Sequence, residues 1–155
     1  MNTVFNTSLL IYTQLQKLLN LGQPIYLLST RLYVSWVFFA SGLTKIKDWD
    51  TTLWLFEEEY NVPLLNYHVA AFLGTAGELV LPIMLAFGLG ARFAAVGLSI
   101  VNVLAVISLQ EIAPAAHTLH ILWGMLLLNI SFFGAGFLSL DRLAKVIYKV
   151  APTRK

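Results

Sequence analysis

An apolar stretch over residues 69–89 limits this chain to folds in which a helix can lie within a bilayer. Only Thr75 and Glu78 in its 21 residues carry polar side chains. A helix of that length spans about 30 Å, the thickness of the hydrocarbon core of a membrane. Glu78 has nine residues of the stretch before it and eleven after it, so it lies near the midplane. A charge at that depth costs about 2.5 kcal/mol or more, so Glu78 must be protonated, paired, or turned toward protein or water.

The composition of the whole chain agrees with a membrane environment. The 155 residues are 58% hydrophobic and 12% charged, whereas soluble globular domains carry about 25% charged residues. The formal net charge of +2 and the placement of basic residues at segment ends exclude nucleic acid as a partner and indicate the lipid bilayer. The absence of cysteine excludes disulfides, thiolate metal sites and a thiol–disulfide relay carried by this chain alone.

Four apolar segments approach the length that a membrane-spanning helix needs. They cover residues 25–46, 69–89, 93–109 and 119–140. Only Gly90, Ala91 and Arg92 separate the second segment from the third, which predicts a tight antiparallel hairpin. The expected fold is an all-α, integral membrane four-helix bundle over residues 25–142, with both termini on one side.

Two further segments predict short amphipathic helices in the membrane interface. In residues 1–24, apolar positions recur at loose helical spacing between polar residues; the alternative is a floppy tail. In the loop over residues 48–68, apolar positions also recur at helical spacing. These positions are Trp49, Leu53, Phe56 and Tyr60. The loop helix is either a plain interfacial anchor or a lid over a cavity between the spanning helices.

Lysine and arginine counts in the short flanks orient the bundle. The side that holds both termini carries Lys17, Arg92, Arg142, Lys145, Lys149, Arg154 and Lys155. The opposite side carries Lys45 and Lys47, followed by acidic residues. Seven basic residues against two predict that both termini are cytoplasmic, with residues 143–155 forming a basic cytoplasmic tail.

A stripe of polar and small residues runs along the first apolar segment. Arg31 and Lys45 are fourteen residues apart, which leaves them about 40° apart around a helix. Ser35, Phe38 and Gly42 fall along the same stripe. Such a stripe faces other helices rather than lipid. Lys45, at the outer end, alternatively extends its ammonium to the interface.

Two residues on other segments are candidate partners of Glu78. Asn102 lies at comparable depth on the third segment, which predicts a hydrogen bond. Arg31 would form an ion pair with Glu78 if its side chain extends inward. The cluster of Arg31, Gly42, Lys45, Glu78 and Asn102 is either buried polar glue for the bundle or a site where a carboxylate accepts a proton or orients a ligand.

The three histidines all fall on the outer side of the predicted bundle. His68 precedes the second segment, and His117 and His120 begin the fourth at a spacing that suits metal ligation. Glu111 and residues 57–59 would complete a metal or haem site. The alternative is that these histidines bond to water or carbonyl groups at the interface. The sequence has no glycine-rich phosphate loop, HExxH pattern or serine nucleophile elbow.

Several short motifs follow one another at regular intervals. After Arg31 come SGLTK (residues 41–45), GELVLP (77–82), GLGAR (88–92) and GAGFLSLD (134–141). Their order and spacing resemble the DoxX family of small four-helix bacterial inner-membrane proteins, over about residues 28–142. The residues that carry the family pattern are Arg31, Gly42, Lys45, Glu78, Pro82 and Arg92.

The resemblance implies a place in the bacterial inner membrane and an association with redox enzymes. The family is named for a relative of a thiosulfate:quinone oxidoreductase subunit, and related membrane proteins act beside redox enzymes or in thiol relays. The lack of cysteine argues against a thiol relay. We therefore expect a redox-associated accessory subunit with a cavity for a quinone-type or other lipophilic ligand near Arg31, Lys45 and Glu78.

Catalysis by such a subunit would require a partner, because the chain has no haem or flavin motif of its own. The expected protein contacts are a partner encoded in a redox or metal-response operon and a second copy of this chain. The alternative functions are a non-catalytic membrane scaffold and a metal-handling accessory protein that uses His68, His117 and His120.

Overall fold

The computed structural model describes residues 2–109 and 111–150, which are almost entirely helical. In chain order the helices are α1 (Asn2–Lys47), α2 (Trp49–Glu58), α3 (Tyr67–Phe87), α4 (Ala91–Ser108), α5 (Pro114–Phe133) and α6 (Leu140–Val150). The described part of the chain contains no strand beyond an isolated bridge between Tyr60 and Leu109. The predicted all-α class is confirmed.

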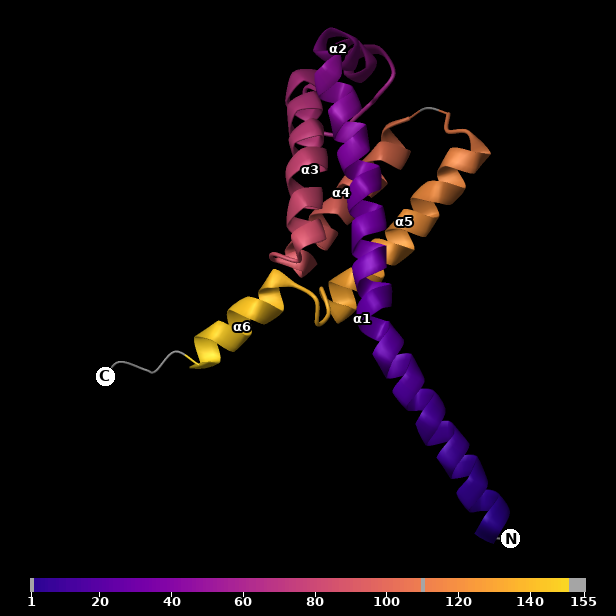
Figure 1. The fold of residues 1–155 in the computed structure, drawn as a ribbon. Coiled ribbons are helices and arrows are strands. Elements are labelled where there is room, and N and C mark those ends of the chain that lie inside the picture. Colours follow the sequence, from indigo (N-terminus) through magenta and orange to yellow (C-terminus); the bar gives the residue numbers. More distant parts are fainter. Residues whose placement is uncertain (1, 110, 151–155) are drawn as a thin grey trace.

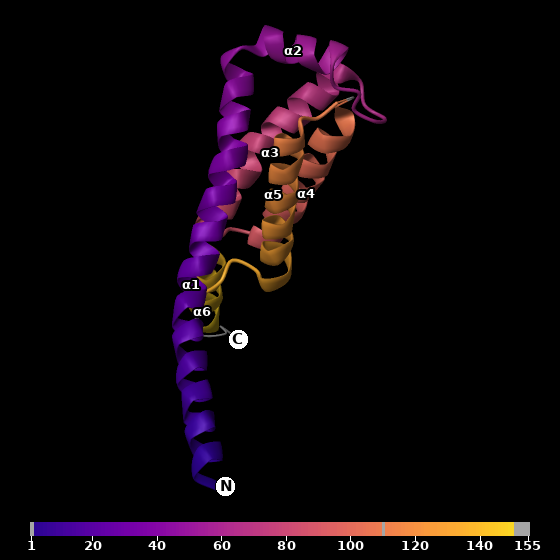
Figure 2. The same ribbon diagram turned by 90° about the vertical axis from the view of Figure 1, so that its right-hand side faces the viewer.

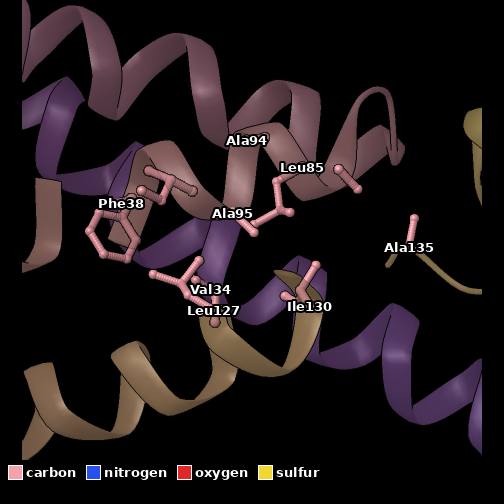
Figure 3. Packing of buried hydrophobic residues seen from close by; sticks show 10 residues of the cluster. Val34, Phe38, Leu85, Ala94, Ala95, Leu127, Ile130 and Ala135 are labelled. Carbon is pink, nitrogen blue, oxygen red and sulfur yellow. The ribbon is translucent and has the colours of Figure 1, made fainter. Parts of the chain in front are cut away.

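The four long helices pack beside one another around a shared core. Helix α3 lies between α1 and α4, and α5 packs against α4 and more lightly against α1 (Figures 1 and 2). All four supply buried side chains to this core, as Figure 3 shows. The members are Val34, Phe38, Leu85, Ala91, Ala94, Ala95, Leu98, Leu127, Ile130 and Ala135. The small residues at the start of α4 let its neighbours approach closely.

Helices α3, α4 and α5 are each long and apolar enough to cross a membrane. They coincide with the second, third and fourth apolar segments of the sequence, although α5 ends well before the predicted residue 140. Glycines in the left-handed region, Gly134 (φ 78°) and Gly136 (φ 76°), lead the chain out of the helix. Large apolar side chains such as Phe72, Val96 and Leu128 are exposed on the outer faces of these helices, as lipid contact requires.

Helix α1 is one continuous helix of 46 residues. At 1.5 Å per residue it is about 69 Å long, more than twice the thickness of a hydrocarbon core. Its C-terminal half packs against the other helices and its N-terminal half extends beyond them (Figures 1 and 2). The prediction of a separate short helix over residues 1–24 is therefore wrong for the described residues. The change in polarity near Pro24 marks where α1 leaves its neighbours, not where the helix ends.

Helix α2 crosses the end of the molecule where α1 and α3 meet (Figure 2). Asp48 caps its first turn by accepting hydrogen bonds from the Thr51 amide (3.0 Å) and hydroxyl (2.8 Å). Phe56 is buried against Ala70 and Ala71 of α3. The short helix thus occupies the predicted loop and is fixed to the end of α3.

Candidate functional site

Glu78 forms an ion pair with Lys45 between α3 and α1. The Lys45 Nζ atom lies 2.5 Å from Glu78 Oε2 and also donates to the Ser41 hydroxyl at 3.0 Å. The Lys45 side chain is 19% exposed and the Glu78 side chain 9% exposed. A paired lysine offsets the cost of placing a carboxylate deep in an apolar helix. Lys45 therefore does not extend away from the protein to the interface.

The two side chains meet although Lys45 lies near the end of α1 and Glu78 lies halfway along α3. Side chains on a helix lean toward its N-terminus. Because α1 and α3 run in opposite directions (Figure 1), the lysine leans inward along α1 and the glutamate leans outward along α3. Residues at different apparent depths consequently become partners.

Gly42 allows α1 and α3 to approach closely beside this pair. A Cβ atom at position 42 would lie 2.9 Å from side-chain carbons of Leu79 and 3.1 Å from the carbonyl carbon of Glu78. Both contacts are shorter than ordinary van der Waals distances. Gly42 therefore acts through helix packing, and it does not line the adjacent cavity.

The ion pair lines a cavity of about 500 Å³ enclosed by α1 to α5. That volume lies within the range of small-molecule sites. Most of the wall is apolar, and includes Val37, Phe38, Phe56, Leu73, Val101, Leu104 and Ala105. Polar groups come from Ser41, Lys45, Tyr60, Glu78, Ser108, His120 and Trp123. A lipophilic molecule with a polar head matches this combination.

Tyr60 and Asn61 close the cavity on the side of α2. The Tyr60 ring stands edge-on to Phe56 with 4.9 Å between centroids. The Asn61 amide donates to the Ser108 carbonyl at 2.9 Å, which fastens this segment to the end of α4. Burial raises the pKa of Tyr60, and the charges of Glu59 and Glu78 add to this effect. Phe56 is the residue of α2 in the cavity wall, and the role of the loop helix as interfacial anchor or lid stays a prediction.

Asn102 bonds to His120 rather than to Glu78. Its Nδ2 atom donates to the His120 carbonyl at 2.9 Å, and its Oδ1 atom lies 2.8 Å from His120 Nδ1. The His120 ring in turn stands edge-on to Trp123 at 4.9 Å. The predicted Glu78–Asn102 bond is wrong, because the two residues share a depth but Asn102 faces α5.

Arg31 lies at the opposite end of the packed helices and does not contact Glu78. It is 1% exposed, and its guanidinium donates to the carbonyl oxygens of Ala86 (3.0 Å), Ala135 (2.5 Å) and Leu138 (3.0 Å). The Ala86 carbonyl belongs to the last turn of α3, where the helix dipole is negative. The predicted Arg31–Glu78 ion pair is wrong, and Arg31 joins helix ends away from the cavity.

Asp141 completes the structure around Arg31. Its carboxylate accepts hydrogen bonds from the amides of Gly90 (2.8 Å) and Ala91 (3.1 Å) at the start of α4. Gly88 has a φ of 67°, and a Cβ there would lie 2.6 Å from Ser139 Cβ. The GLGAR and GAGFLSLD segments therefore pack directly on each other.

The three histidines do not form a metal site. Among residues 2–109 and 111–150, no group of three histidine, aspartate or glutamate side chains could hold a metal ion. His68 stacks on Tyr67 at the start of α3, with 4.1 Å between ring centroids. His117 lines an outer groove of about 300 Å³ between α4 and α5, while His120 also turns inward toward Asn102. The predicted site of His68, His117 and His120 is wrong for the described residues, because His117 and His120 border one groove while His68 lies at the start of α3, and no group of three ligands forms.

Sequence reasoning did not assign Ser41, Tyr60, Ser108 or Trp123 to a site, although Ser41 and Trp123 follow from helical spacing. Trp123 lies three residues after His120, so the two share a face of α5. Ser41 lies one turn before Lys45 on α1 and accepts its hydrogen bond. Helical spacing from residues already singled out would have found both.

Comparison with known proteins identifies the family. The model of the DoxX family matches residues 26–111, more than half of the chain. The chain belongs to the DoxX family. It is similar to an uncharacterized protein of Haemophilus influenzae, with 32% identity over 145 residues that cover 85% of this chain and 91% of that protein. No solved structure matches the chain. The family and the three apolar helices together indicate a DoxX membrane protein whose matched region contains Lys45, Glu78 and Asn102.

Proposed function

We propose that this DoxX protein binds a quinone-type lipophilic molecule in the cavity beside Lys45 and Glu78, and that it acts as an accessory subunit of a redox partner. The supporting observation is a buried ion pair in the wall of a mostly apolar cavity of about 500 Å³. Membrane-embedded charges are rare and costly, and they commonly mark ligand or proton paths.

The ion pair retains hydrogen-bonding capacity for a ligand. An ammonium group has three N–H donors. Two of those on Lys45 are directed to Ser41 and Glu78, which leaves one for a ligand carbonyl. The second carboxylate oxygen of Glu78 can accept a hydrogen bond from a ligand hydroxyl. The apolar wall would surround the ring and the start of its hydrocarbon tail.

The proposed setting is the bacterial inner membrane, with α1, α3, α4 and α5 crossing it as a four-helix bundle. Helix α1 would cross through its C-terminal half, residues 25–46. The basic residues near both termini and at the α3–α4 turn support a cytoplasmic location of these ends by the positive-inside rule. Helix α2 and the cavity then lie toward the outer surface.

Helix α6 fits the cytoplasmic interface in this orientation. Leu140, Leu143 and Ile147 recur at helical spacing and are exposed. Arg142 and Lys145 lie between them in the sequence. A helix with one apolar and one basic face lies flat in the headgroup region, where anionic lipids attract its charges.

The redox chemistry itself belongs to the proposed partner. The sequence contains no haem or flavin motif and no cysteine. In this proposal the chain holds the head group of the ligand in a dry site, and the partner exchanges electrons with it.

Quenching of Trp123 fluorescence by decylubiquinone would test the proposal, because Trp123 lines the cavity. The protein would be reconstituted in lipid nanodiscs with the other tryptophans, Trp36, Trp49 and Trp54, replaced by phenylalanine. We expect saturable quenching that Ala105→Phe, which fills the cavity, abolishes. Val96→Phe adds bulk on an exposed face of α4 away from the cavity and should leave binding unchanged.

Two outcomes would reject the proposed site. One is quenching that never saturates, which indicates partitioning into lipid alone. The other is equal loss of binding in Ala105→Phe and Val96→Phe, which indicates a general effect of added bulk. A folded protein without any saturable binding would instead favour the scaffold function.

A further inference from the structure

Asn102 determines which ring nitrogen of His120 carries the proton. The Asn102 Nδ2 atom faces the His120 carbonyl oxygen at 2.9 Å, and a carbonyl oxygen only accepts hydrogen bonds. This contact fixes the amide orientation, so the atom 2.8 Å from His120 Nδ1 is Asn102 Oδ1. An amide oxygen is also only an acceptor, so His120 Nδ1 must donate. In the neutral ring, Nε2 then carries a lone pair and no proton.

The free nitrogen belongs to a ring that borders the proposed ligand site. His120 lines the same cavity as Lys45 and Glu78, and it also borders the outer groove between α4 and α5. Trp123 holds the ring edge-on at 4.9 Å. None of the described residues donates a hydrogen bond to Nε2, and that atom is not among the fully buried polar atoms that lack a partner. Nε2 therefore keeps its capacity to accept a hydrogen bond.

We propose that His120 Nε2 accepts a hydrogen bond from a ligand hydroxyl, so that the cavity prefers the phenolic, hydroquinone form of the ligand. This inference rests on the proposed function. The oxygen of a quinone carbonyl would place its lone pairs against that of Nε2, and neither group could donate. A hydroquinone can donate one hydroxyl to Nε2, while its other hydroxyl bonds to Lys45 and Glu78. Asn102 is a positioning residue in this arrangement, because it acts through the ring of His120.

The tautomer can be tested without any ligand. Nitrogen-15 NMR of histidine-labelled protein at pH 8 distinguishes the two neutral forms, and the loss of a signal in His120→Gln assigns it. We expect His120 in the wild type to carry its proton on Nδ1, and Asn102→Leu to shift the population toward protonated Nε2. A wild-type ring protonated on Nε2 would overturn the inference and leave the proposed function intact.

Ligand preference supplies the second test. We would compare the binding of decylubiquinol, kept reduced by dithionite, with that of its dimethyl ether, which has the same ring and tail but no hydroxyl. The absence of cysteine means that the reductant cannot alter the protein through disulfides. We expect the quinol to bind about a hundredfold more tightly, because the ether loses the hydrogen bonds to both His120 and Glu78 and each is worth about tenfold. His120→Phe should reduce the ratio to about tenfold, because the hydrogen bond to Glu78 remains, whereas His117→Phe, which borders only the outer groove, should retain the full ratio.

The outcomes separate this inference from the proposed function. Equal affinities for quinol and ether in the wild type, or an unchanged ratio in His120→Phe, would contradict the role of His120 while ligand binding stands. Failure of the quinol, the ether and decylubiquinone to bind would contradict both.

Discussion

Lys45 and Glu78 join α1 and α3 through a contact of 2.5 Å between ammonium and carboxylate. The pair neutralises two charges inside an apolar bundle and contributes to the polar part of a cavity wall. Stability and ligand binding therefore depend on the same two residues. The effect of a substitution on protein stability must therefore be measured separately from its effect on ligand binding.

Removing one partner should destabilise the protein more than removing both. Glu78→Leu or Lys45→Met leaves one buried charge without its counter-ion, which costs about 3–5 kcal/mol. The double variant Lys45→Met/Glu78→Leu replaces the pair with apolar side chains and should recover most of that loss. Equilibrium unfolding in mixed micelles would measure all four proteins. Additive losses in the double variant would show that the two charges do not stabilise each other.

Gly42→Ala should weaken the packing of α1 on α3. The added methyl group would lie 3.1 Å from the Glu78 carbonyl carbon, and such overpacking costs about 1–3 kcal/mol. Gly22→Ala is the matched control, because no atom lies within 4 Å of a Cβ at that position of the same helix. The control should be neutral or stabilising by up to about 1 kcal/mol. Equal thermal midpoints for the two variants would refute the close-approach role of Gly42.

The contacts around Arg31 should stabilise the end of the molecule at the α3–α4 turn without affecting ligand binding. Arg31→Met leaves three carbonyl groups without their donor and should cost about 3 kcal/mol or more. Asp141→Ala removes the cap of α4 and should cost about 1 kcal/mol. Hydrogen exchange should increase at the α3–α4 turn in both variants. Asp50→Ala, at an exposed site on α2, should leave that turn unchanged.

The cap of α2 should make the stability of that end of the molecule sensitive to acid. Hydrogen bonds from the Thr51 amide and then its hydroxyl lower the pKa of Asp48 below its usual value. The folded state therefore binds the proton more weakly than the unfolded chain does. The resulting stabilisation is present above the unfolded pKa of about 3.9 and is lost as pH falls through the lower folded value. Wild type and Asp48→Ala should differ in thermal midpoint at pH 7 and converge in acid; a gap that persists in acid would contradict this cause.

Single cysteines can test the placement of α6, because the natural chain has none. Spin labels at Leu143 and Ile147 should be relaxed by oxygen dissolved in the lipid, and labels at Arg142 and Lys145 by a water-soluble nickel complex. A label at Phe72, on the exposed face of α3, provides the lipid reference. Labels that all report water would show that α6 stands away from the membrane.

Sequence periodicity located the helices better than it located their ends. Helices α3 and α4 begin within two residues of the predicted segments. The predicted fourth segment ran on to residue 140, because GAGFLSL is apolar although its glycines take positive φ. The predicted break near residue 24 failed for the opposite reason, since α1 continues through a change in polarity.

The sequence singles out Lys45 and Glu78, but it does not predict that they pair with each other. The position of Glu78 within its apolar segment gives its depth along the helix. The sequence therefore correctly predicts that Glu78 is buried. The pairing with Lys45 depends on helix direction and on the lean of long side chains, which spacing along one helix does not reveal. The role of Arg31 depends on carbonyl groups of a distant loop, which carry no signal of their own in the sequence.

The most direct test of the ligand site is the affinity of the Lys45→Met/Glu78→Leu double variant for decylubiquinone, measured by Trp123 quenching in nanodiscs. The variant should remain folded, so a change in affinity reports on the ligand contact. We predict binding at least about tenfold weaker than in the wild type, because the apolar replacements cannot hydrogen-bond the head group. Wild-type affinity in a folded double variant would contradict the account and leave Lys45 and Glu78 with a purely structural role.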